Sequence, residues 1–136
     1  MTATRWALRS GVLAGLLVPA LLAQAEEPSP RVKLAQDLAR AHAASATGKQ
    51  WLALNHGRAA QLMVPVLQKC VEEVQDGDLM SFSTYLRLSQ KGRVLEIVTE
   101  LDAELGRCMT KEAGDVQLPA APREDFWIQV NLAAML

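Results

Sequence analysis

Two cysteines and two histidines are the side chains of this sequence most suited to chemistry. They are Cys70, Cys108, His42 and His56, spread over 136 residues. A histidine acts as a general base only when a partner group lies within hydrogen-bond reach. His56 lies in Asn55-His56-Gly57, a sequence typical of a loop, and no such partner is indicated. We therefore interpret His56 as a solvated turn residue and not as a catalytic base.

The sequence lacks the usual motifs for metals, phosphates and nucleophilic catalysis. It has no Cys-x-x-Cys, His-x-x-x-His or Glu-x-x-His pattern, so no zinc or iron ligands are indicated. It has no glycine-rich phosphate loop, and no Gly-x-Ser-x-Gly sequence surrounds Ser81, Ser83 or Ser89. We therefore predict a protein that is not an enzyme and has no catalytic residues, no metal and no cofactor.

Two acidic groups are the remaining candidates for a cation site. They lack the ligand order and the glycine of a calcium-binding loop, so we interpret them as solvated faces. The residues are Glu72, Glu73, Asp76 and Asp78 in one group and Glu100, Asp102 and Glu104 in the other.

The first 25 residues have the features of a cleavable export signal. Arg5 and Arg9 precede an apolar run of 13 residues, 11–23, which ends in Ala23-Gln24-Ala25. A membrane-spanning helix needs about 20 apolar residues, so the run favours a signal over a membrane anchor. We expect a mature chain that starts at Glu26, is periplasmic or secreted, and has no stable membrane insertion.

The mature segment, 26–136, has the length of a single domain. It contains 12 basic and 15 acidic residues, a net charge of −3, so we expect no bulk attraction to nucleic acid. Disulfides form and persist in an oxidising compartment. Cys70 and Cys108 are therefore predicted to pair, and two free buried thiols are the alternative.

Hydrophobic spacing predicts six elements in the mature segment. Helical spacing is found in 32–46, in 59–74 and in a segment that begins at Asp102 and ends at Gly114. Residues 51–54 are interpreted as a short apolar turn broken at 55–57, and Pro65 as either a helix start or a kink. Alternating spacing predicts strands at 82–88, 94–99 and 126–132, with a hairpin turn at 90–92.

The expected fold is α+β, with the element order ααββαβ. A hairpin and a C-terminal strand form a small three-stranded antiparallel sheet that packs with helices. Cys70 and Cys108 lie on the apolar stripes of their helices, so a disulfide joins two helices if both pack on one sheet face. We divide the domain into an N-terminal helical segment, 26–57, and a core, 58–136.

The C-terminal strand offers the best candidate for a binding surface. Its alternation points one set of side chains at the helices, namely Phe126, Ile128, Val130 and Leu132. The opposite side carries the candidate partner-binding residues Tyr85, Trp127, Gln129 and Asn131, and exposed aromatic residues often mark interaction surfaces. The alternative is that the N-terminal helix, with Trp51, covers this face.

Four features of residues 63–132 occur in the same order in a known family. A helix leads into the strand 82–88, the hairpin carries Gln90-Lys91-Gly92-Arg93-Val94, and a second helix follows. Leu118-Pro119-Ala120-Ala121-Pro122 then precedes a closing strand that starts at Phe126. In these features the segment resembles the C-terminal domains of TonB and TolA, the periplasmic arms of bacterial energy-transducing systems. The resemblance implies a small periplasmic module that binds another protein.

The expected function is therefore that of an exported envelope accessory protein. It binds an envelope protein or peptide without catalysis, and strand addition at an edge of the sheet is one route to such binding. Two alternatives stay open. One is a small periplasmic enzyme or enzyme inhibitor with an unidentified site, and the other is a structural envelope protein that self-associates as a homo-oligomer.

Overall fold

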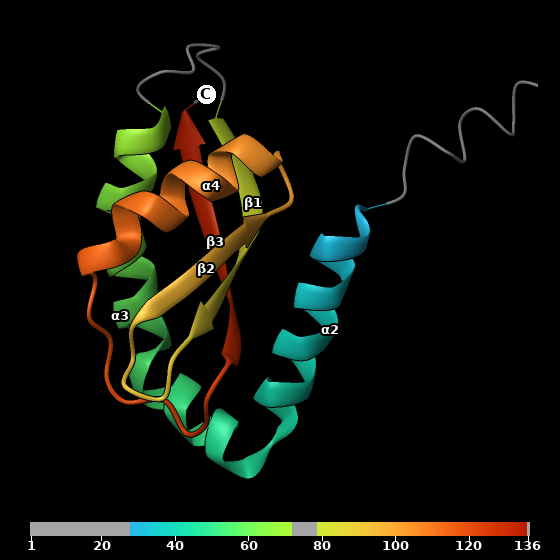
Figure 1. Cartoon of the computed structure of the whole chain (residues 1–136), viewed down its shortest axis with the longest axis vertical. Helices are drawn as coiled ribbons and strands as arrows, with labels where there is room; N and C mark the ends of the chain where they lie inside the picture. Colours follow the sequence, from blue (N-terminus) through green and yellow to red (C-terminus); the bar gives the residue numbers. More distant parts are fainter. Residues whose placement is uncertain (1–27, 72–78, 136) are drawn as a thin grey trace, which may run out of the picture.

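The computed structural model describes residues 28–71 and 79–135 (Figure 1). The predicted export signal and its cleavage site lie outside the described residues, as do Glu72, Glu73, Asp76 and Asp78.

The described elements follow the predicted order ααββαβ, which confirms the α+β fold class. The helices are α2 (Pro30–Ala44), α3 (Ala46–Val71) and α4 (Ala103–Glu112), and a short 3-10 helix follows at Ala113–Asp115. The strands are β1 (Leu79–Leu88), β2 (Val94–Thr99) and β3 (Phe126–Met135). The hairpin and the closing strand thus form where the alternating pattern predicts them.

The sheet is antiparallel and has the strand order β2-β1-β3. Tyr85 in the central strand lies opposite Val98 of β2 and Gln129 of β3. The C-terminal strand is therefore an edge strand, and so is β2.

One face of the sheet packs against α3 and α4 in the larger of two hydrophobic clusters. Phe82, Leu86 and Ile128 from the sheet meet Met63 of α3 and Met109 of α4 there. The amphipathic spacing of both helices places these residues on one stripe each.

The predicted disulfide joins the same two helices. Cys70 of α3 is bonded to Cys108 of α4, with their Cα atoms 5.9 Å apart, a usual separation for such a bridge.

The opposite face of the sheet is covered by α2, in a separate and smaller cluster. Val32, Ala35 and Ala39 of α2 pack there against Tyr85 and Trp127. Figure 1 shows α2 apart from α3 and α4, so the sheet lies between two helical layers.

The predicted helix boundaries before residue 59 are wrong. The first helix, predicted at 32–46, ends at Ala44. Residues 51–57 form neither a turn nor a loop, because α3 runs unbroken from Ala46 to Val71. The break falls at Ser45, whose hydroxyl accepts a hydrogen bond from the Gly48 amide at 3.0 Å and so caps the new helix. The boundary at 57/58 therefore lies inside α3.

Pro65 also lies inside α3, and neither starts nor ends it. Buried Met63, Val66 and Leu67 surround this proline in the sequence and hold the helix on the sheet. Their packing outweighs the local cost of proline, about 3 kcal/mol.

Candidate functional site

The two edges of the sheet differ in how their backbone groups are satisfied. The amide of Glu100 donates to the Ser83 carbonyl at 3.3 Å. The backbone amides and carbonyls of the even-numbered residues near the end of β2 therefore point toward β1. By alternation, Ile97 and Thr99 direct their backbone groups outward. The same pattern directs the backbone of Trp127, Gln129 and Asn131 outward from β3.

The outer edge of β2 is closed by α4. Thr110 Oγ1 accepts a hydrogen bond from the Ile97 amide at 2.9 Å and donates to the Gly106 carbonyl at 2.7 Å. A Cβ atom on Gly106 would lie 3.0 Å from the Ile97 carbonyl oxygen, so α4 lies directly on this edge. A further strand cannot pair with β2 while α4 occupies this position.

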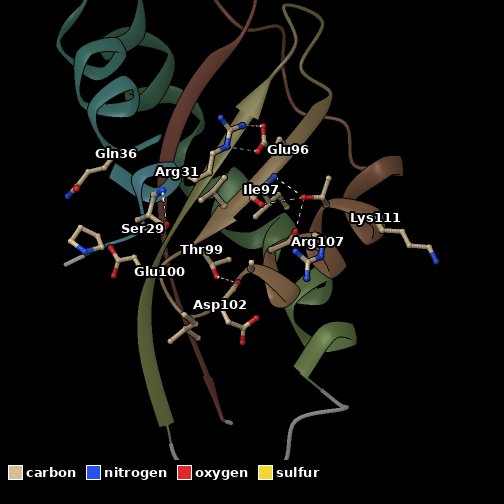
Figure 2. A pocket seen from close by; sticks show the side chains of 17 residues that line it. Ser29, Arg31, Gln36, Glu96, Ile97, Thr99, Glu100, Asp102, Arg107 and Lys111 are labelled. Carbon is tan, nitrogen blue, oxygen red and sulfur yellow. Dashed lines mark hydrogen bonds and ion pairs between the residues drawn. The ribbon is translucent and has the colours of Figure 1, made fainter. Parts of the chain in front are cut away.

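A cavity of about 1050 Å³ lies beside this closed edge, between α2, β2 and α4. Figure 2 shows Arg31 of α2 reaching Glu96 of β2 at its rim, and the two side chains form an ion pair. Arg107 and Lys111 extend from α4, while Glu100 and Asp102 also line the space. Cations and anions are therefore balanced here, and the lining shows no preference for a ligand of one charge.

Two polar side chains that line the cavity form hydrogen bonds with backbone groups. Thr99 Oγ1 donates to the Asp102 carbonyl at 3.2 Å, and the Asp102 side chain accepts from the Leu105 amide at the start of α4. Both polar groups thus bond to the backbone, whereas the Glu100 carboxylate accepts a hydrogen bond from the Tyr85 hydroxyl.

The outer edge of β3 lies between α2 and α3. These helices diverge from their junction, with α2 on one face of the sheet and α3 on the other (Figure 1). Near the junction the Trp127 amide donates to His42 Nδ1 at 2.9 Å. One outward-facing position further along, His56 Nε2 lies 3.2 Å from the Gln129 carbonyl oxygen.

A small groove of about 350 Å³ lies along this edge, and His56 forms part of its wall. Its floor is formed by Gln129 and Asn131, and the two helices supply its walls, namely Ala39, Arg40, Ala43, Leu52 and His56. The side chains of Gln129 and Asn131 are exposed and hydrogen-bond to each other at 3.2 Å. Arg40 is the one permanently charged residue among these lining residues.

Three groups on the α2 side of the sheet have shifted proton affinities. Burial, followed by the charge of Arg123, lowers the pKa of His42 below its usual value. Burial and the nearby Glu100 carboxylate, which accepts a hydrogen bond from the Tyr85 hydroxyl at 3.2 Å, raise the pKa of Tyr85. The hydrogen bond to Asp125 is the main reason that the pKa of Arg87 is raised.

The four candidate partner-binding residues fall into two pairs. Tyr85 is fully buried and Trp127 is 4% exposed, because α2 covers both, so the predicted open aromatic face is not present. Trp51 takes no part in this cover, since it packs edge-on against Phe126 with ring centroids 5.4 Å apart. Gln129 and Asn131 remain exposed, at the edge of the sheet.

Both histidines belong to this edge, and the sequence interpretation did not place them there. His56 is exposed, as expected, but it lies within α3 and not in a turn. His42 follows Ala35 and Ala39 at helical spacing, on the stripe that packs against the sheet. That spacing was the available signal, and it marks His42 as a residue facing the sheet.

Comparisons with family models, curated proteins and solved structures find no match to this chain. Within residues 28–71 and 79–135, no helix has the length and apolar character needed to cross a membrane. Over the same residues, no three acidic, histidine or cysteine side chains cluster as metal ligands would.

Proposed function

We propose that this chain is an exported envelope accessory protein that binds an extended segment of another protein by strand addition to β3. The observation that carries the proposal is the outward-facing backbone of β3 at Asn131, beyond the histidine contacts and within a groove between two helices. An extended segment can pair its own amides and carbonyls with such an edge. Closure of the β2 edge by α4 leaves β3 as the edge that can accept a strand.

The groove favours a partner segment with a particular character. Arg40 on its wall suits a carboxylate in the incoming segment. Small side chains at Ala39 and Ala43 leave space for the partner's residues beside α2. We therefore propose a partner strand from an envelope protein with an acidic residue on the side that faces α2.

Catalysis is not part of this proposal. Thr99 and Asp102 of the larger cavity bond to backbone groups, and a net charge of −3 in the predicted mature segment disfavours nucleic acid as a partner. A periplasmic module that binds a protein is also what the resemblance of residues 63–132 to the TonB and TolA C-terminal domains implies.

Site-specific photo-crosslinking in intact cells tests the proposal. A photoreactive residue at Asn131 is expected to form an adduct with one defined segment of an envelope protein. The same group at Lys111, on the α4 side, serves as the matched control and is expected to give no such adduct. A synthetic peptide of the captured segment must then shift the backbone amide resonances of Asn131.

Two results contradict the proposal. Adducts between two copies of this chain at Asn131 would favour the structural, self-associating alternative. Equal capture from Asn131 and Lys111 would show that the β3 edge has no particular role.

A further inference from the structure

We infer that His42 is an acid-sensitive latch, which holds α2 against β3 while its imidazole is neutral and releases α2 when the ring is protonated. The role of the latch rests on the proposed function, because it would regulate how much of the β3 edge is open to a partner strand. The latch itself depends on the contacts of His42 and on how the rest of α2 is held.

The hydrogen bond at the centre of the latch requires an unprotonated nitrogen. The backbone amide of Trp127 is a donor and cannot accept, and it points at His42 Nδ1 over 2.9 Å. Nδ1 must therefore offer its lone pair, which places the ring proton on Nε2. A proton added to Nδ1 removes the acceptor and sets two donors against each other.

The ring of His42 is also packed in a way that disfavours a positive charge. His42 is 7% exposed and stacks on Phe126, with centroids 5.7 Å apart and planes 13° apart. Burial withholds the water that would solvate an imidazolium.

No acid compensates such a charge among the described groups that face His42. Arg123, from the segment before β3, adds a repelling charge. The acids beside Phe126 are engaged elsewhere, since Asp125 accepts from Arg87 at 2.8 Å and Glu124 accepts from the Gln90 amide at 3.2 Å.

The remaining elements around His42 contribute backbone and uncharged groups. At the junction of the helices the Ser45 hydroxyl donates to the His42 carbonyl at 2.7 Å. The first turn of α3 approaches the same carbonyl with Gly48, which has no side chain.

The cover formed by α2 is separable from the rest of the fold. To its cluster α2 contributes small side chains, Val32, Ala35 and Ala39, and that cluster shares no residue with the larger one. The His42 ring links α2 to the larger cluster by stacking on Phe126. The disulfide lies entirely within that larger part. Local opening is expected where few apolar contacts hold an element.

The other end of α2 is held by exposed contacts. Arg31 pairs with Glu96 and lies over the Trp127 ring, 5.7 Å from its centroid. The Arg31 side chain is 51% exposed, and ion pairs of this kind add little stability. Of these two polar contacts between α2 and the sheet, the one made by His42 is therefore the buried one.

Release of α2 would enlarge the proposed binding edge. It frees the outward amide of Trp127 near the start of β3, while the Gln129 carbonyl keeps its contact with His56 of α3. It also uncovers Tyr85 and Trp127, the aromatic residues that α2 buries.

A nuclear magnetic resonance titration of the disulfide-bonded protein, without any partner, tests the latch. We follow the His42 ring nitrogens, the Trp127 amide and the contacts between α2 methyl groups and the Trp127 indole. Near neutral pH the Nε2–H tautomer and all of these contacts are expected. The pKa of docked His42 lies below the ordinary histidine value of 6.5. As the pH falls from 6.5 through that lowered pKa, the α2 contacts are expected to disappear together with the Trp127 hydrogen bond, while β1–β3 pairing persists.

Two variants separate the two histidines. His42→Asn places a non-titrating amide oxygen near the position of Nδ1, so α2 is expected to stay docked at acid pH. His56→Gln is the matched control and is expected to open as the native protein does. The latch would be overturned if α2 of His42→Asn still opened at acid pH. It would also be overturned if α2 of the native protein stayed docked until the sheet itself unfolds.

The test distinguishes the latch from the proposed function. A captured peptide that binds equally at all pH values, with α2 always docked, would refute the latch and leave strand addition standing. Acid release of α2 with no peptide bound at any pH would leave the latch standing and refute strand addition.

Discussion

The hydroxyl of Thr84 is buried at the centre of the sheet and has no hydrogen-bond partner among the described residues. Burying such a group without a partner costs roughly 1–3 kcal/mol. Thr84→Val keeps the shape of the side chain and suits a strand. We expect this change to raise the free energy of unfolding by about 1 kcal/mol in urea titrations. A loss of stability would mean that the hydroxyl does have a partner.

Trp127 is a structural residue and not a surface anchor. Its side chain is 4% exposed and lies in the hydrophobic cluster that α2 covers. Trp127→Ala is therefore expected to lower the free energy of unfolding by at least about 2 kcal/mol, as truncation of a buried aromatic residue does. Chemical denaturation measures this loss. An unchanged midpoint would place the indole outside the packed cluster.

At the level of single elements, α3 offers a matched pair of glycine substitutions. Gly57 is exposed within the helix and a Cβ atom would meet nothing within 4 Å, so Gly57→Ala is expected to stabilise by about 0.5–1 kcal/mol. A Cβ atom on Gly48 would overlap with the His42 carbonyl oxygen, so Gly48→Ala is expected to destabilise. Thermal unfolding of both variants gives the signs. A stabilising Gly48→Ala would show that the α2–α3 junction is not tightly packed.

The strands and the later helix were predictable because their signals are local. The alternation of 126–132 and the N-cap at Asp102 act within a few residues, and both appear in the structure, where the Asp102 side chain accepts from the Leu105 amide. The disulfide was predicted from the oxidising compartment that an export signal implies and from the position of both cysteines on apolar stripes, and the structure confirms it. It required no knowledge of the N-terminal helices.

The continuity of α3 and the cover by α2 depend on contacts distant in sequence. Trp51 holds the first half of α3 by donating to the Ala120 carbonyl at 2.9 Å, a partner 69 residues away that local propensity cannot show. The stripe of α2 consists largely of alanine, whose weak hydrophobic signal does not reveal which face it will cover. For the same reason the exposure of Trp127 could not be judged from the sequence.

At the scale of the whole molecule, the disulfide links α3 and α4, the two helices on the sheet face opposite α2. It closes a loop of 38 residues between α3 and α4, for which chain entropy gives roughly 4 kcal/mol of stabilisation. The double change Cys70→Ser and Cys108→Ser is expected to lower the free energy of unfolding by an amount of this order. Calorimetry of the oxidised native chain and the double variant provides the comparison. Equal stability would mean that the bridge adds nothing to the packed helices.

Strand addition at β3 is tested most directly with the synthetic peptide of the segment that crosslinking identifies. The measurement is the affinity of this peptide for the native protein and for two variants of Asn131. The backbone of Asn131 points away from β1, so Asn131→Pro removes an outward donor and keeps the β1–β3 hydrogen bonds. Asn131→Ala retains that donor and controls for the side chain. Strand addition predicts that Asn131→Pro lowers the affinity at least tenfold, about 1.4 kcal/mol, and that Asn131→Ala changes it little. Equal affinity of folded Asn131→Pro and native protein would contradict it.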